Sequence, residues 1–169
     1  MIVVSDTTPL RYLAVVGGLD WLPVMFGEVI CPVEVIEECL HPGAPPFLRE
    51  WTASAPTWLR IAAAPQEAKL PKIPFRLDAG ETAALALANG LGADLLLMDE
   101  RRGRDAAAHL GLAVTGTLGI LVEASRLGLV DFEVVLAQLT STTNFRASEA
   151  VIALARARLS GLKDEGTSG

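Results

Sequence analysis

The chain has 169 residues, about half of them apolar, which suits one domain around a single core rather than two domains. Its formal net charge of −6 argues against a protein that coats nucleic acid nonspecifically through a basic surface, but it does not exclude an enzyme that acts on nucleic acid. No apolar run reaches the roughly 18 to 20 residues that span a bilayer. Met1 leads into Ile2-Val3-Val4 without a basic segment, so we expect a cytoplasmic protein without a signal peptide.

The chain has two cysteines, Cys31 and Cys39. Their separation does not fit a CxxC metal or redox motif, and no histidine stands at zinc-finger spacing. We therefore expect two reduced and mostly buried thiols, which also fits a cytoplasmic protein.

Strand-like and helix-like patterns alternate along the first forty residues. Ile2–Ser5 is a short β-branched run and predicts a strand, and Thr8–Val16 has helical spacing with Pro9 suited to the first turn. Three further elements are expected here: a short helix at Leu19–Phe26, a strand at Glu28–Cys31, and a helix from Pro32 to about Leu40 with its core face at Val33, Ile36 and Leu40.

The stretch from His41 to Phe75 is the least regular part of the chain. It contains seven of the ten prolines, and we interpret it as an excursion over the surface that is too short for a second domain. Within it we expect one short helix near Phe47–Ala53 and an edge strand at Trp58–Ala62.

Regular patterns return at Leu77. Asp78–Asn89 is rich in alanine and leucine and predicts a helix closed by Gly90. Asp94–Met98 is a continuous apolar run, typical of a buried parallel strand. The remaining expected elements are a helix at Arg101–Leu110 ended by Gly111, a strand at Leu112–Thr115, and helices at Thr117–Leu127, Phe132–Leu139 and Ala147–Leu159.

This alternation of strands and helices predicts an α/β fold, a three-layer α/β/α sandwich around a central parallel sheet. We expect residues 1–162 to form this single domain. Residues 163–169 lack apolar side chains and are expected to form a disordered tail.

Acidic residues follow the strands, where ligands bind in a parallel sheet. Asp6 directly follows the first strand, and Asp99, with Glu100 beside it, follows the most apolar strand. Glu81 stands in the first turn of the helix before that strand, and Glu38 lies on the helix that Pro32 opens. Carboxylates from such dispersed segments are the oxygen ligands that Mg²⁺ requires, and metal-assisted phosphodiester cleavage uses such an ion.

Each acid also has a structural explanation. Asp6 and Asp99 are both placed to cap the helices that follow them. Asp78 and Glu81 fit a capping box, in which the two side chains satisfy each other's backbone. Glu38 competes with two other glutamates on its helix and fits a solvated face. The sequence leaves both interpretations open at every position.

The order of the motifs resembles the PIN-domain family, in particular a PIN-like branch related to VapC toxins. The resemblance covers about residues 1–130 and fits the proline-rich excursion only loosely. The segments that carry it are Val4–Leu10, Pro32–Glu38, Asp78–Leu85, Leu97–Arg101 and Val114–Gly119.

This resemblance implies a parallel sheet flanked by helices, Mg²⁺ or Mn²⁺ as cofactor, and endoribonuclease activity. By motif, the four catalytic acids are Asp6, Glu38, Glu81 and Asp99, of which Asp6, Glu81 and Asp99 hold the metal. Many PIN nucleases have Asp where Glu81 stands, and Glu100 makes the fourth position ambiguous. Many members are toxins held inactive by an antitoxin protein.

Hydroxyl and basic side chains are the expected substrate contacts. Thr7 and Thr117 match polar positions of the family. Arg101, Arg102 and Arg104 follow Asp99 and are placed to contact phosphates, although a solvated helix face explains them as well.

The sequence thus predicts a hydrolase, a metal-dependent endoribonuclease that cleaves RNA with metal-activated water, with RNA and an antitoxin as partners. The competing hypothesis is an inactive PIN-like scaffold that binds RNA or a protein. A phosphatase with an aspartyl nucleophile is disfavoured because Thr8 stands where a second Asp is usual, and no P-loop motif occurs.

The last helix leaves the oligomeric state open. Its apolar residues fit either the core of the domain or the interface of a homodimer. These residues are Val151, Ile152, Leu154 and Leu159.

Overall fold

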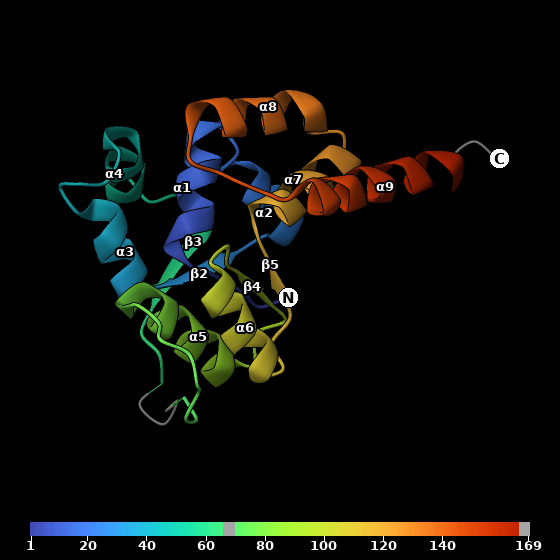
Figure 1. The fold of residues 1–169 in the computed structure, drawn as a ribbon. Coiled ribbons are helices and arrows are strands. Elements are labelled where there is room, and N and C mark those ends of the chain that lie inside the picture. Colours follow the sequence, from blue (N-terminus) through green and yellow to red (C-terminus); the bar gives the residue numbers. More distant parts are fainter. Residues whose placement is uncertain (66–69, 166–169) are drawn as a thin grey trace.

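The computed structural model describes residues 1–65 and 70–165, without the side chains of 162–165. Within this part of the chain, five parallel strands form one sheet in the order β3-β2-β1-β4-β5 (Figure 1). The strands are β1 (Val3–Ser5), β2 (Val29–Pro32), β3 (Leu59–Ala62), β4 (Leu95–Leu97) and β5 (Val114–Thr115). The expected edge position of the Trp58–Ala62 strand is therefore confirmed.

Helices cover both faces of the sheet, which confirms the predicted three-layer α/β/α sandwich (Figure 1). One layer contains α5 (Ala79–Leu91) and α6 (Arg101–His109). The opposite layer contains α1 (Thr7–Val15), α2 (Trp21–Phe26), α7 (Thr117–Arg126), α8 (Phe132–Thr142) and α9 (Glu149–Glu165). Beside α1 and α5 lie α3 (Val33–Leu40) and α4 (Pro46–Ala53).

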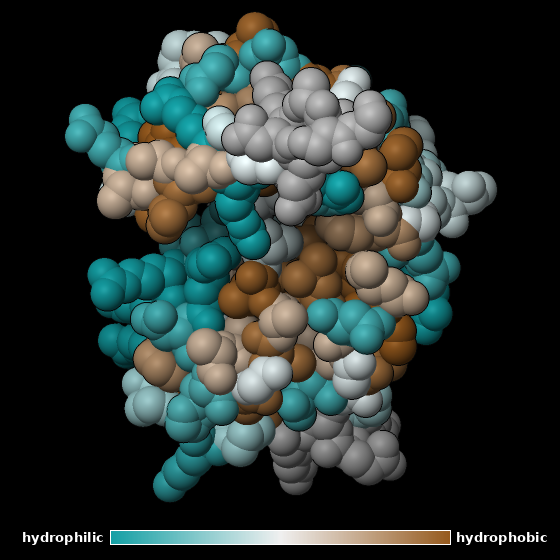
Figure 2. Space-filling view, turned by 90° about the vertical axis from the view of Figure 1, so that its right-hand side faces the viewer, coloured by the Kyte–Doolittle hydropathy of each residue, from teal (hydrophilic) through white to brown (hydrophobic). Residues whose placement is uncertain are grey.

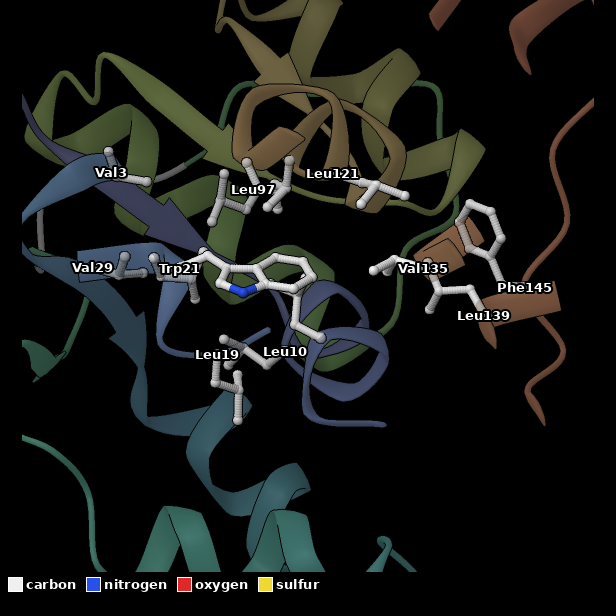
Figure 3. Close-up of a cluster of buried hydrophobic side chains, with 14 of the residues drawn as sticks. Val3, Leu10, Leu19, Trp21, Val29, Leu97, Leu121, Val135, Leu139 and Phe145 are labelled. Atoms are coloured by element: carbon white, nitrogen blue, oxygen red, sulfur yellow. The ribbon is translucent and has the colours of Figure 1, made fainter. Parts of the chain in front are cut away.

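Alternation along the strands divides the core into two clusters. Val3 and Leu97 point into the larger cluster, which packs against α1, α2, α7 and α8 (Figure 3). Val4 follows Val3 and Leu96 precedes Leu97, so both point to the opposite face of the sheet, where they pack against α5 and α6. A strand buried on both faces must be apolar at every position, which explains the continuous run at Leu95–Leu97.

Two details of the helices differ from expectation. Gly90 does not close α5, which continues to Leu91 and ends at Gly92, a residue in the left-handed region (φ 58°). There the N–H of Ala93 donates to the carbonyl oxygen of Ala88 at 2.8 Å, a Schellman-type ending that glycine favours. Gly90 is tolerated inside the helix at a cost of about 1 kcal/mol.

The core face of α3 also differs from the prediction. Val33 and Leu40 are 40% and 43% exposed, whereas Val35, Ile36 and Cys39 are buried. Packing against β2, α4 and α5 rotates the helix, so that only Ile36 of the expected triplet faces the core.

The end of α9 lies past the expected domain boundary at residue 162. The helix runs to Glu165, and the rest of the expected tail, residues 166–169, lies outside the described residues.

Two further expectations concern the cysteines and the membrane. Cys31 and Cys39 are both buried and free, as predicted. Burial raises the pKa of both thiols, that of Cys39 to about 11, which keeps them protonated and unreactive. No helix in the described part of the chain has the length and apolarity needed to cross a membrane.

Candidate active site

The site lies where the order of the strands changes direction. β1 pairs with β2 on one side and with β4 on the other, and helices leave these strands at the same edge of the sheet. Ligands of parallel sheets bind at such switch points. Asp6 follows β1 directly, and its backbone N–H donates to the carbonyl oxygen of Leu97 at 2.9 Å. Asp99 comes two residues after Leu97, so the acids that follow both strands stand at this point.

Asp6 is a buried carboxylate without a capping role. Its residue is only 3% exposed, and its side chain makes no capping hydrogen bond to α1. Its pKa is raised to about 7, chiefly by burial and also by the charges of Asp78, Glu38 and Glu81, whereas a hydrogen bond from the Thr7 backbone lowers it. The capping explanation therefore does not hold for Asp6, which lies close to three other acids.

Glu38 is held at this place by two contacts from neighbouring helices. The Thr7 hydroxyl donates to its Oε2 at 2.6 Å. A Cβ atom added to Gly80 would lie 2.5 Å from its Oε1, so the first turn of α5 approaches the end of the Glu38 side chain closely. Glu38 is exposed and lies between α1 and α5, where one hydrogen bond orients it but leaves the end of the side chain able to move.

Asp78 and Glu81 form the capping box that their spacing predicts. The Glu81 N–H donates to Asp78 Oδ1 at 2.8 Å, and the Asp78 N–H donates to Glu81 Oε2 at 2.9 Å. Glu81 is nonetheless buried beside other acids. Burial is the largest cause that raises its pKa, the charges of Asp78 and Glu100 also raise it, and the hydrogen bond from the Asp78 backbone lowers it in part. Glu81 therefore has a structural role through its Oε2, and its Oε1 is left to bind a ligand.

Asp99 is held by the N-terminus of α7 instead of capping α6. The Thr117 N–H donates to its Oδ1 and the Thr117 hydroxyl to its Oδ2, both at 2.7 Å. Burial raises the pKa of Asp99, while the bonds from Thr117 and the charge of Arg104 lower it in part. Thr117 is fully buried, so it is suited to orienting Asp99 rather than to contacting substrate.

A cleft of about 820 Å³ opens beside these carboxylates. Its lining includes Thr7 and four acids, of which Glu38 and Glu81 are predicted site residues. Basic residues line it as well, including the predicted Arg101 and Arg102. The remaining charged residues of the lining are Arg11, Arg76, Asp78 and Glu100. Asp99 and Arg104 line a neighbouring groove. The charges of Glu38 and Glu81 act on Asp6, so these three acids lie close together, with Asp99 after the neighbouring strand.

A comparison with protein-family models identifies the family of this chain. A family model described as a PIN domain matches residues 2–160. The chain belongs to the PIN-domain family. The match extends beyond residue 130, where the resemblance in sequence motifs ended, and therefore includes α8 and most of α9. No curated protein and no solved structure matches the chain.

PIN domains are generally nucleases that use divalent metal ions, and the chemistry of the donors in this PIN domain suits such an ion. Asp6 is buried, lacks a capping bond and is repelled by neighbouring acids, so a cation would relieve its unfavourable charge. In the described residues, however, no three acids, histidines or cysteines are arranged to hold a metal ion. Glu38, Glu81 and Asp99 each accept hydrogen bonds from the protein instead.

Three residues of the PIN site were not identified from the sequence. Asp78 was assigned only to the capping box, yet its charge acts on Asp6 and Glu81. Gly80 and Gly116 leave room for carboxylates, since a Cβ on Gly116 would lie 2.6 Å from Asp99 Oδ1. A glycine beside a predicted catalytic acid, as in the Gly80-Glu81 pair, was the available signal.

Proposed function

We propose that this PIN domain is a metal-dependent endoribonuclease that hydrolyses phosphodiester bonds of RNA. The observation that supports this most is Asp6, a buried carboxylate crowded by Glu38, Asp78 and Glu81 at the switch point of the sheet. A buried charge among like charges is costly for the fold, and functional sites are where such costs occur. In a metal-dependent nuclease, this buried carboxylate would serve as a ligand of the metal ion.

The residues have separate roles in this proposal. Asp6, Glu81 and Asp99 would hold Mg²⁺ or Mn²⁺, with Glu38 completing the site. When bound, the cation supplies a Lewis acid that stabilises charge on the phosphoryl oxygens. Thr7 orients Glu38, and Thr117 orients both oxygens of Asp99.

Basic side chains allow a polyanion to approach these acids. Arg101 and Arg102 line the cleft together with Arg11 and Arg76. They are suited to binding the phosphates on either side of the cleaved bond. Arg104 has a structural contact, because its Nη1 donates to the carbonyl oxygen of Met98 at 3.1 Å.

Cleavage of a labelled single-stranded RNA with Mn²⁺ tests the proposal. Asp6→Asn should abolish cleavage and leave the circular dichroism spectrum unchanged. Asp20→Asn is the matched control, because Asp20 is exposed and makes no capping bond. Undiminished cleavage by Asp6→Asn would refute the assignment.

The proposal extends to a toxin of the VapC-related branch, neutralised by an antitoxin in the cytoplasm. Expression of the wild-type chain should then stop growth of a bacterial host, and co-expression of the neighbouring reading frame should restore it. Expression of Asp6→Asn should not affect growth. Unrestricted growth with the wild-type chain contradicts the toxin role but not the nuclease.

A second candidate is an inactive scaffold that binds RNA or a protein. It is favoured by the absence of a three-ligand group in the described residues and by the structural role of Glu81 in the capping box. Calorimetric titration with Mn²⁺ separates the two functions. The nuclease should bind the ion, whereas a lack of binding at millimolar Mn²⁺ favours the scaffold.

A further inference from the structure

A second hollow lies beside the cleft, between α9 and the N-terminal ends of α6 and α7. We define it as the arginine groove, and its volume is about 640 Å³. Four of the chain's 14 basic residues line it, against one of its 20 acidic residues, Asp99. The basic residues are Arg101, Arg104, Arg146 and Arg158. In a chain of net charge −6, this concentration of positive charge is local and selects for an anionic ligand.

Of these arginines, only Arg101 forms an ion pair among the described residues, and the charge of Arg104 acts on Asp99. In the described part of the chain, neither Arg146 nor Arg158 takes part in an ion pair, whereas Arg156, on α9 like Arg158, pairs with Glu133 at 2.7 Å. The Arg146 Nη1 donates only to the carbonyl oxygen of Phe145, which fixes the side chain but leaves its charge uncompensated. Arg158 on α9 and Arg146 just before it therefore present positive charge that no ion pair among the described residues balances.

The groove is continuous with the cleft in its lining residues. Arg101 lines both, and Asp99 contributes the acid of the groove. A chain of phosphates bound in the groove would therefore lead to the carboxylates beside Asp6. Figure 2 shows one face of the molecule hollowed between its upper and lower parts, with hydrophobic residues inside the hollow and hydrophilic ones at its edge.

Apolar side chains complete the groove. Val151 and Leu154 on α9 are 48% and 67% exposed and line it together with Leu118. Such aliphatic surface suits the sugars and base faces of an unpaired strand, while the arginines suit its phosphates. A duplex has its bases stacked inside and would not use this surface.

We infer that the arginine groove binds the single-stranded RNA on one side of the bond to be cleaved, with Arg146, in the loop before α9, and Arg158, on α9, as phosphate contacts. The inference rests on the proposed function for the nature of the strand. It adds a binding role for α9, the segment for which the sequence motifs indicated no chemistry. The groove extends the substrate contacts beyond the arginines near Asp99.

RNA binding measured under conditions that prevent cleavage tests the role of the groove directly. Fluorescence anisotropy with a short labelled single-stranded RNA in chelator measures Kd across a series of salt concentrations. Arg146→Ala combined with Arg158→Ala should weaken binding roughly tenfold and lower the salt slope by about 1.4, because each single-strand phosphate contact contributes about 0.7. The matched control combines Arg60→Ala and Arg126→Ala, two exposed arginines outside the groove that carry the same total charge.

The outcomes separate the groove from the nuclease proposal. If both double variants bind RNA as the wild type does, or if both lose the same affinity and slope, the groove inference is wrong, whatever the Asp6→Asn cleavage assay shows. A groove that holds a second copy of the chain would give another result. In that case Leu154→Ser would change the molar mass in solution and the arginine variants would leave RNA affinity unaltered, which also overturns the inference.

Discussion

The cleft and the arginine groove share Arg101 but differ in how their charges are balanced. The cleft has four acids and four arginines in its lining, with Asp6 buried beside them. The groove has four arginines and only Asp99. In the cleft the arginines only equal the lining acids in number, and the buried Asp6 adds a further acid, whereas in the groove Asp99 alone opposes four arginines. One region thus suits metal and the other suits a polyanion.

The two aspartates that follow the strands differ in how firmly the protein holds their carboxylates. Asp99 accepts two hydrogen bonds from Thr117, so its orientation is fixed before any ligand binds. Asp6 makes no capping bond, and its pKa of about 7 reflects burial among other acids. Asp99 is therefore pre-oriented, and Asp6 has the most to gain from a bound cation.

The largest expected effect is the loss of cleavage. Asp6→Asn or Asp99→Asn should lower the rate of RNA hydrolysis by about 1,000-fold, because a ligand that places a Lewis acid contributes several kcal/mol to the transition state. Single-turnover cleavage with Mn²⁺ measures this for both variants. A loss in one variant alone would show that only one of the two aspartates belongs to the site.

The next effect concerns stability and pH. In chelator, Asp6 titrates near 3.8 when unfolded and at about 7 when folded, so the folded state binds more protons between these values. Its contribution to the free energy of unfolding is therefore present at low pH and lost as pH rises from about 4 to about 7. At pH 8, Asp6→Asn should be more stable than the wild type by about 2 to 4 kcal/mol, and at pH 4 the difference should largely vanish.

Urea unfolding at a series of pH values measures this difference. Asp99, whose pKa is also raised, remains in the variant. Glu81, whose charge acts on Asp6, loses that repulsion in the variant, which adds to the gain in stability at pH 8. If the difference in free energy of unfolding between Asp6→Asn and the wild type is the same at pH 8 and at pH 4, the surroundings do not destabilise the Asp6 carboxylate.

A smaller effect is expected at the two glycines. Gly116→Ala puts a methyl group against Asp99 Oδ1 and within 3.1 Å of Arg104 Nη1, and it should lower cleavage roughly tenfold to 100-fold. Gly80→Ala meets the end of the flexible Glu38 side chain, which can move aside, so it should cost less than tenfold. Gly161→Ala, with open space around the added atom, is the control. Equal losses at Gly80 and Gly116 would contradict the distinction between a fixed Asp99 and a movable Glu38.

The smallest expected effect is at Thr7. Thr7→Val removes the 2.6 Å hydrogen bond to Glu38 and keeps the shape of the side chain, so it should lower cleavage only severalfold. Steady-state kinetics should place the loss in kcat rather than KM. A change in KM alone would make Thr7 a substrate contact, as the sequence motifs suggest.

Much of the fold was predictable because the patterns are local. The apolar run at Leu95–Leu97 and the β-branched run at Val3–Val4 indicate buried strands from their composition alone. The Asp78–Glu81 capping box follows from residues three apart. These features need no knowledge of the tertiary structure.

The contacts that shape the site were not predictable in this way. Thr7 meets Glu38 across 31 residues and Thr117 meets Asp99 across 18, and both pairings depend on the order of the strands. The rotation of α3, which exposes Val33 and Leu40, depends equally on its neighbours. The sequence identified the acids but not which of them the fold would hold in place.

A crystal soaked in Mn²⁺ tests most directly whether a divalent cation binds at Asp6. Anomalous scattering should show one strong peak in direct contact with the Asp6 carboxylate, with Glu81 or Asp99 on the same ion, and no such peak in Asp6→Asn. A wild-type crystal in millimolar Mn²⁺ without a peak at Asp6 would contradict the account and leave the scaffold as the better explanation.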